Sequence, residues 1–274
     1  RIDIESFRAK MEEWRKTFNE AESAETQSDI IKKVDEFERE YSSYQAIASL
    51  NYNRNVNDKD AKAEKDYFDS IGPVASEITN AFNQELVNSK FRNELEKIWG
   101  RQFFSQIEMD LKTFDPSIMD MMLEETKLRN EYTQLIAGAK VEYNGETYNL
   151  AGLGPFHKDS DREVRKSSYA ARLDWFNGNA DTFDELYDKL VKLRHKIAIT
   201  LGYESFIELG YLRMGRSDYG PNEVANFRTQ IVDYVVPLVK KLNEQRQEIL
   251  GLDHLYFYDG INYKEGDPKP KGTP

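Results

Sequence analysis

Residues 141–150 read VEYNGETYNL and interrupt a chain whose pattern is otherwise helical. Apolar and polar residues alternate around Asn144-Gly145, a dipeptide that favours a two-residue hairpin turn because both turn positions need a positive φ. The alternation predicts a β-hairpin with four paired positions, Val141 and Tyr143 against Tyr148 and Leu150. A lone hairpin is marginally stable in water, so we expect it to pack on the helices or on another part of the protein.

Helical periodicity fills the chain before the hairpin, from residue 3 to about residue 139. Apolar residues recur three and four positions apart in two clear stripes, Phe7, Met11, Trp14 and Phe18, then Ile30, Ile31, Val34, Phe37, Tyr41 and Tyr44. Gly72-Pro73 and Asp115-Pro116 predict helix boundaries, because proline lacks the N–H that an interior helical position donates. We expect at least four helices here.

Helices are predicted again after the hairpin. Ser160 and Glu163 have the spacing of a capping box, in which two side chains satisfy free N–H groups of the first turn. A later apolar stripe, residues 183–201, ends at Gly202, and glycine tolerates the left-handed conformation common after a helix C-terminus. These signals predict one helix that starts at Ser160 and another that stops before Gly202.

A shorter helix should follow through Tyr211, and a long one should run from Pro221 to about Leu250 with a kink at Pro237. No fixed repeat relates the helices. The predicted fold class is therefore all-α, an irregular multi-helix array with one small β-hairpin at about residues 141–150. We expect two regions, a helical one at residues 1–139 and a hairpin-plus-helix one at residues 140–274.

The composition is that of a folded chain with an acidic surface. Its 274 residues are 39% hydrophobic and 32% charged, and 49 Asp plus Glu against 38 Lys plus Arg give a net charge of -11. That charge argues against nucleic acid and anionic lipid as partners, and no apolar run reaches the length of about 18 residues that crosses a membrane. Zero cysteines exclude disulfides and thiolate metal sites and fit a reducing compartment. We therefore expect a cytoplasmic protein.

The three histidines form no local metal motif. His157, His195 and His254 are far apart in the sequence, and H-E-x-x-H, a helical pair of zinc ligands with a glutamate base between them, is absent. We expect His195 on a solvated helix face and His157 in a turn after the hairpin. His254 stands beside the aromatic residues 256–258, where it could line a cleft or serve only packing. We expect no metal site within this chain.

A less ordinary segment is residues 210–220, GYLRMGRSDYG. Arg213, Arg216 and Tyr219 share this connection with three glycines. Such a loop can present cations and hydroxyls to a peptide backbone or carboxylate. The alternative is that both arginines cap helix C-termini and pair with neighbouring acids. No nucleophile elbow, phosphate-binding loop or dinucleotide-binding glycine motif is present elsewhere.

Three stretches together resemble the oligoendopeptidase F-type zinc metallopeptidases of the thimet oligopeptidase-like superfamily. They are residues 140–176, KVEYNGETYNLAGLGPFHKDSDREVRKSSYAARLDWF, residues 211–237, which contain RMGRSDY and VVP, and residues 250–272, LGLDHLYFYDGINYKEGDPKPKG. They follow one another in the family's order. The combination is therefore more specific than any one stretch.

The resemblance implies a largely helical zinc endopeptidase whose N-terminal half covers a deep cleft that admits short peptides. In the family, the two histidines of H-E-x-x-H and a later glutamate hold zinc, and the motif glutamate activates the bound water. None of these residues can be placed on this sequence. We therefore expect a chain that is inactive alone and leads into a missing C-terminal catalytic domain, with short peptides and zinc bound by the full-length enzyme.

Two functional hypotheses follow. The chain is either the N-terminal part of such a peptidase or a non-catalytic helical binding or scaffold protein. The ending PKPKGTP looks like a linker cut midway and favours the first hypothesis, under which a large apolar face should be exposed. Five residues are expected to approach the substrate cleft of the intact enzyme, namely Arg213, Arg216, Tyr219, His254 and Tyr258.

Overall fold

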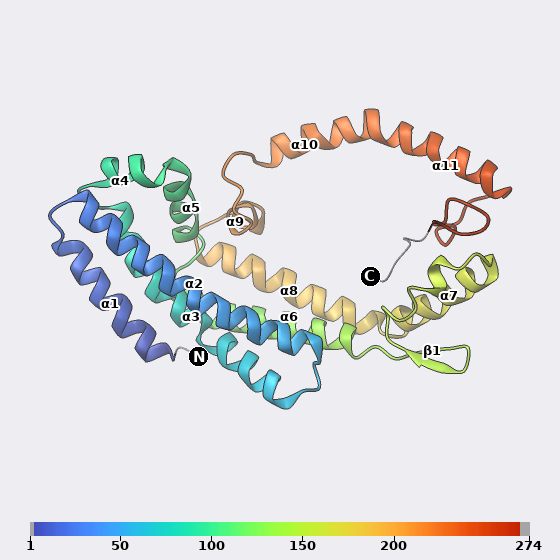
Figure 1. Cartoon of the computed structure of the whole chain (residues 1–274), viewed down its shortest axis with the longest axis horizontal. Helices are drawn as coiled ribbons and strands as arrows, with labels where there is room; N and C mark the ends of the chain where they lie inside the picture. Colours follow the sequence, from blue (N-terminus) through green and yellow to red (C-terminus); the bar gives the residue numbers. More distant parts are fainter. Residues whose placement is uncertain (1–2, 269–274) are drawn as a thin grey trace. The chain divides into compact units, whose positions relative to one another are not determined.

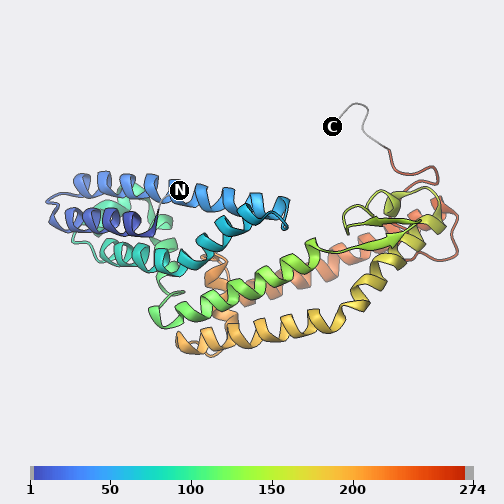
Figure 2. The same cartoon turned by 90° about the horizontal axis from the view of Figure 1, so that it is seen from below.

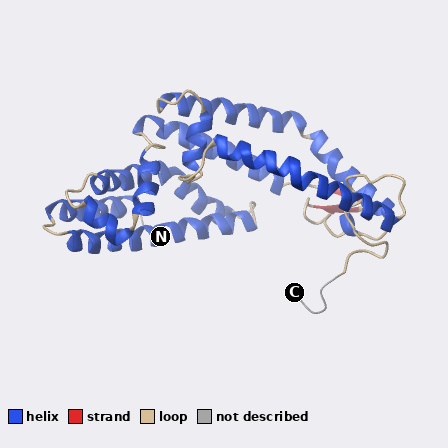
Figure 3. Ribbon diagram, turned by 90° about the horizontal axis from the view of Figure 1, so that it is seen from above, coloured by secondary structure: helices blue, strands red, loops and turns tan. Residues whose placement is uncertain are grey.

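The computed structural model describes residues 3–268. Helices dominate it, and its strands form one small antiparallel sheet (Figure 3). The α-helices are α1 (Ile4–Glu20), α2 (Ala24–Arg54), α3 (Lys59–Val87), α4 (Arg92–Trp99), α5 (Arg101–Leu111), α6 (Met119–Ala137), α7 (Arg162–Gly178), α8 (Ala180–Thr200), α9 (Phe206–Arg213), α10 (Pro221–Gln230) and α11 (Val236–Leu250). The other elements are β1 (Val141–Tyr143), β2 (Glu146–Tyr148), the 3-10 turns η1 (Pro116–Ile118) and η2 (Phe156–Lys158), and the π-helical turn η3 (Ile231–Val235). The predicted fold class is confirmed.

The described residues form two compact units that are interleaved in sequence. The N-terminal unit runs to Glu131 and includes Leu186–Asp218, whereas the hairpin unit contains Tyr132–Glu185 and the chain from Tyr219 onward. Helices α6 and α8 each begin in one unit and end in the other. The two units do not test the predicted domain boundary near residue 139, which stays a prediction. The predicted linker, residues 268–274, lies outside the described residues apart from Pro268.

The core of the N-terminal unit is built by α1, α2 and α3, which lie side by side in Figures 1 and 2, together with α4 and α5. Asp3 and Ser23 cap the first two helices by accepting backbone N–H groups of the first turn. Both predicted apolar stripes point inward, and Phe7 and Phe18 are 1% and 0% exposed. The stripe on α2 ends at Tyr41, because Tyr44 is exposed.

The prediction that Gly72-Pro73 ends a helix is wrong. Pro73 is buried inside α3, which continues to Val87. Proline removes one intrahelical hydrogen bond, but apolar residues on both sides of it, including Phe68 and Ile78, are buried in the core. The free energy gained by burying these residues exceeds the cost of the hydrogen bond that the proline removes. The boundary at Asp115-Pro116 is confirmed, since Asp115 caps η1 between α5 and α6.

The hairpin has the predicted turn but a shorter ladder. Asn144 and Gly145 have φ of 53° and 80°, and a two-residue loop necessarily places Tyr143 opposite Glu146. Of the predicted pairing of Val141 and Tyr143 against Tyr148 and Leu150, residue 141 does pair with residue 148, whereas the parts that involve Tyr143 and Leu150 are wrong. The buried side chains of β1 pack with Leu153 and against α7, which supplies the support that a lone hairpin lacks.

Two helix-end predictions differ in outcome. Helix α7 starts at Arg162 with Asp161 as its N-cap, so the capping residue predicted at Ser160 is wrong by one position. The Asp161 carboxylate accepts a hydrogen bond from the Glu163 N–H at 2.9 Å. Aspartate is as favourable an N-cap residue as serine. Helix α8 ends as predicted, since Gly202 has φ of 89° and the next N–H bonds back into the helix.

The predicted long helix is present from Pro221 to Leu250, but it contains the π-helical turn η3. Pro237 lies in the first turn of α11, directly after η3, and its missing N–H removes one hydrogen bond to the turn in front of it. The predicted irregularity thus takes the form of a wide turn in front of the proline. Within residues 3–268, no helix combines the length and apolarity needed to cross a bilayer.

Candidate functional sites

The N-terminal unit contains a pocket of about 890 Å³. Its walls come from α1, α2, α3, α5, α6, α8 and α9 and from the segment after α5. Charged and polar side chains line much of it, including Glu38 of α2, Glu125 of α6, Arg194 of α8 and Arg213 of α9. A volume of this size suits a drug-sized molecule or the end of a short peptide.

An ion cluster centred on Glu125 forms part of the wall. Arg194 donates from Nε to one carboxylate oxygen at 2.7 Å, and Arg213 donates from Nη1 to the other at 2.9 Å. Both guanidinium groups also lie over the ring of Phe206, at 5.7 and 5.8 Å from its centroid. Burial would raise the pKa of Glu125, but the two arginines lower it overall. The cluster therefore carries a net positive charge at neutral pH.

The loop after α9 is held within the N-terminal unit up to Asp218. Arg213 is the last residue of α9, lines the pocket and pairs with Glu125. The alternative interpretation, in which this arginine pairs with an acid, is therefore observed. Arg216 lies over the Tyr211 ring at 4.7 Å. Gln102 of α5 donates to the Ser217 hydroxyl at 3.0 Å and ties the loop to the helix core.

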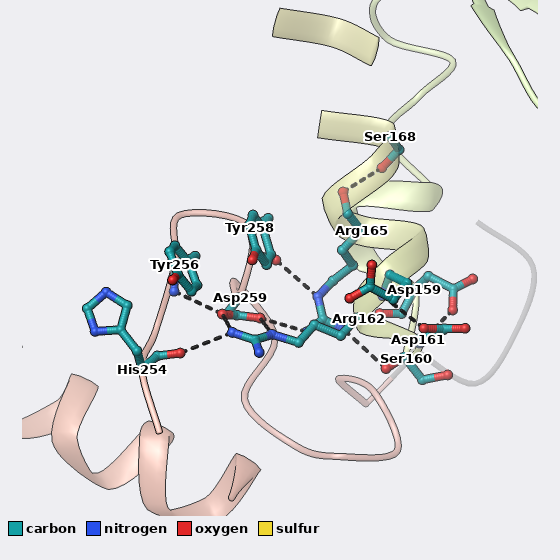
Figure 4. A network of polar contacts seen from close by, with 11 residues as sticks. Asp159, Ser160, Asp161, Arg162, Arg165, Ser168, His254, Tyr256, Tyr258 and Asp259 are labelled. Atoms are coloured by element: carbon teal, nitrogen blue, oxygen red, sulfur yellow. Dashed lines mark hydrogen bonds and ion pairs between the residues drawn. The ribbon is translucent and has the colours of Figure 1, made fainter. Parts of the chain in front are cut away.

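The second cluster lies in the hairpin unit, where Arg162 and Arg165 of α7 enclose Asp259 (Figure 4). Arg162 donates to the two carboxylate oxygens at 3.0 and 2.8 Å, and Arg165 donates to one of them at 3.0 Å. Arg165 also donates to the carbonyls of Asp159, Ser160 and Tyr258. With Asp259 0% and Arg165 2% exposed, this is a buried and well-satisfied ion network.

The network folds the aromatic tail, residues 254–259, onto α7. Asp259 accepts the Tyr256 N–H at 2.9 Å, and Arg162 donates to the His254 carbonyl at 3.0 Å. The rings of Tyr256 and Tyr258 stack at 5.3 Å, and the Arg162 guanidinium lies 5.6 Å from each ring centroid. Tyr258 is buried by this packing, whereas the His254 side chain remains exposed.

The five predicted contact residues thus divide between the two units. Arg213 and Arg216 belong to the N-terminal unit, and Tyr219, His254 and Tyr258 belong to the hairpin unit. The structure brings together His254 and Tyr258 through Tyr256, which touches both rings. The residues that hold these segments were not predicted from the sequence; they are Glu125, Arg194, Arg162, Arg165 and Asp259. The three-residue spacing of Arg162 and Arg165 indicates that both lie on one face of a helix, but their partner Asp259 lies more than ninety positions away in the sequence.

Asp259 should make the stability of the hairpin unit dependent on pH. Burial alone would raise its pKa, but hydrogen bonds from Arg162, the Tyr256 N–H and Arg165 lower it to about 2 from an unfolded value of 3.8. The stabilisation from a depressed carboxylate pKa is fully present above about pH 5 and is lost as the pH falls towards 2. We expect the free energy of unfolding, measured in urea at pH 6 and pH 3, to fall less in Asp259→Asn than in the wild type. Equal falls would contradict this assignment.

The histidines do not meet in a metal site. His195 is exposed on α8 as predicted, and His157 lies in η2, where its ring stacks on Tyr169 at 3.9 Å. Burial and the charge of Arg172 lower the pKa of His157. Between residues 3 and 268, no group of three His, Cys, Asp or Glu side chains could hold a metal ion. These residues do not fit a zinc centre, and we assign no zinc-dependent step to them.

Comparison with known proteins identifies the family. Residues 1–114 match the sequence profile of the peptidase M3 N-terminal domain, and residues 156–270 match that of peptidase family M3. The chain belongs to the M3 peptidases. Among curated proteins, none matches the chain.

Solved structures similar to this M3 peptidase chain are about twice as long. An oligoendopeptidase F is 39% identical with a TM-score of 0.95, PZ peptidase A with an inhibitor is 38% identical with 0.96, and an oligoendopeptidase F from Bacillus anthracis is 35% identical with 0.94. All of this chain aligns to each, but it covers only 48%, 49% and 51% of them. The predicted relation to oligoendopeptidase F is confirmed, and the scaffold hypothesis is not favoured.

Proposed function

We propose that this chain is the N-terminal, cleft-covering part of a zinc-dependent oligoendopeptidase that hydrolyses short peptides. The observation that carries the proposal is the alignment of the whole chain with three peptidase structures of which it spans about half. The zinc ligands are proposed to lie outside this sequence, since the described residues offer no set of ligands. Zero cysteines support a cytoplasmic location within the same proposal.

Exposed apolar side chains on the long helix support the proposal that a further part of the protein packs there. Exposed apolar side chains occur along α10, η3 and α11, and we call the following six the α10–α11 face: Phe227, Val232, Val235, Val236, Val239 and Leu242. Their exposed fractions run from 42% for Val235 to 61% for Phe227 and Val232. Contiguous apolar patches are uncommon on the surface of an independent domain. We propose that the catalytic part of the protein packs on this face.

The proposal is tested by comparing this chain with the full-length protein in cleavage of a quenched fluorescent peptide of about ten residues. We expect the full-length protein to cleave the peptide and to lose activity when a chelator removes zinc. The chain alone should hold no stoichiometric zinc in equilibrium dialysis and should not cleave. A full-length protein without chelator-sensitive peptidase activity would refute the proposal.

Within that proposal, Arg213, Arg216, Tyr219, His254 and Tyr258 are the residues proposed to contact substrate. The position of Arg213 in the pocket wall and the exposure of the His254 ring support contact. The same peptide assay of full-length Arg213→Ala and Arg216→Ala tests it. Loss of a charge-assisted hydrogen bond should lower kcat/KM about tenfold or more when activity is expressed per amount of folded protein.

The matched control is Arg54→Ala, which removes an exposed arginine at the end of α2. It should leave kcat/KM and Tm unchanged. If Arg213→Ala and Arg216→Ala behave like this control, or if their activity falls only in step with the amount of folded protein, the two arginines have a structural role and are not contact residues.

A further inference from the structure

We propose that the pocket of the N-terminal unit binds the primary ammonium group of a peptide, either its free N-terminus or a lysine side chain, against the carboxylate of Glu38. The ammonium site follows from the pocket itself. Only the identification of the ligand as a peptide rests on the proposed function.

The carboxylate of Glu38 lines the pocket without a cationic partner. It is half-buried, and its Oε1 accepts a hydrogen bond from the Thr79 hydroxyl at 2.7 Å. No lysine, arginine or histidine pairs with it in the part of the chain that the structure describes; the neighbouring Arg39 pairs with Asp35 at 2.9 Å. Burial raises the pKa of Glu38 despite the opposing hydrogen bond from Thr79, as expected for a desolvated carboxylate that lacks a counter-ion.

Other oxygen-bearing side chains line the same walls. Tyr41, Ser42 and Gln45 follow Glu38 at helical spacing on one face of α2, and all four line the pocket. Tyr41 is 8% exposed, and its hydroxyl has no hydrogen-bond partner among the described residues. An ammonium group carries three N–H donors. A bound ammonium group would therefore neutralise the carboxylate and find further acceptors close to it.

The pocket offers no internal substitute for that cation. Arg129, Arg194 and Arg213 also line it, but none of them pairs with Glu38, and Arg194 and Arg213 both bind Glu125. A metal ion is a poor fit, since no third carboxylate or histidine completes a ligand set within residues 3–268. Glu38 thus carries a charge in the pocket that a ligand can satisfy.

The Glu38 carboxylate keeps acceptor capacity for a ligand. The Thr79 hydroxyl donates to Oε1, and no described residue donates to Oε2. A lysine or N-terminal ammonium is a compact point charge that can bind through a single carboxylate oxygen.

The test is calorimetric binding to the full-length protein, with a chelator present to prevent cleavage. Three probes distinguish the two sources of the ammonium group, namely trialanine amide, N-acetyl-trialanine amide and N-acetyl-Ala-Lys-Ala amide. Wild-type protein should bind trialanine amide or the lysine peptide at least about tenfold more tightly than the acetylated alanine peptide, because a charge-assisted contact is worth about 1.5–3 kcal/mol. Whichever ammonium-bearing probe binds identifies the source.

Glu38→Gln keeps an oxygen for Thr79 but removes the charge, so it should abolish the preference for the ammonium probe and leave the affinity for the acetylated alanine peptide unchanged. Glu38→Asp keeps the charge and should retain part of the preference. The control Glu36→Gln, at an exposed position of the same helix, should behave as wild type. Equal binding of all three probes by the wild type, or an unaltered preference in Glu38→Gln, would overturn the proposal. Cleavage by the full-length enzyme is measured separately, so failure here leaves the peptidase proposal standing.

Discussion

Replacing Asp259 with alanine is expected to destabilise the hairpin unit by about 3–5 kcal/mol, the usual cost of removing one partner from a buried ion network. The variant leaves Arg165, which is 2% exposed, without its counter-charge. It also removes the acceptor for the Tyr256 N–H and the carboxylate that orients Arg162 over the tyrosine rings. Both the aromatic tail and the start of α7 should therefore open more often.

The measurement is urea unfolding combined with amide hydrogen exchange. Exchange should accelerate in the tail and in the first turns of α7, while α1 to α5 in the N-terminal unit keep their protection. The control Asp253→Ala removes an exposed carboxylate from the same segment and should change stability by no more than about 0.5 kcal/mol. If both variants unfold at the same urea concentration as the wild type, the network does not hold the tail.

Replacing Glu125 with alanine should destabilise the N-terminal unit by about 2–3 kcal/mol. The substitution leaves Arg194 and Arg213 side by side over Phe206 with no acid between them. The expected loss is smaller than for Asp259 because these arginine side chains are 36% and 23% exposed, and solvent screens their repulsion. Thermal unfolding followed by circular dichroism measures the difference.

Glu124→Ala is the matched control, because Glu124 is the preceding residue of α6 and is exposed. It should melt within a degree or two of the wild type, since such surface changes are usually worth less than about 0.5 kcal/mol. A second variant, Glu125→Gln, keeps the side-chain volume and separates loss of charge from loss of packing. Equal melting temperatures for Glu124→Ala and Glu125→Ala would show that the cluster does not stabilise the unit.

Local sequence signals predicted the structure wherever a single residue type was physically required. The turn at Asn144-Gly145 needs two positive φ angles, and the structure has both. The end of α8 at Gly202 follows from the same preference for glycine at positive φ. The apolar stripes of α1 and α2 are buried because a period of 3.6 residues gathers them on one face of each helix.

Predictions failed where local preference competed with packing. Pro73 opposes a continuous helix, yet the burial of α3 on both sides of it exceeds the cost of one lost hydrogen bond. Ser160 and Asp161 are both good N-caps, so the choice between them was not decided by propensity. In the structure the carbonyl of Ser160 accepts a hydrogen bond from Arg165, and Asp161 takes the capping position.

By itself, the sequence determined the all-α class, the hairpin and the relation to the M3 peptidases, because these depend on residue order and on spacing within one element. Only the tertiary structure decided the partners of the charged residues. Glu125 meets arginines from α8 and α9, and Asp259 meets arginines of α7 that precede it by more than ninety positions. Helical periodicity gives the face on which a side chain lies but not the distant residue opposite it. That pairing depends on how the helices pack, and it left Glu38 as a pocket carboxylate without a cation.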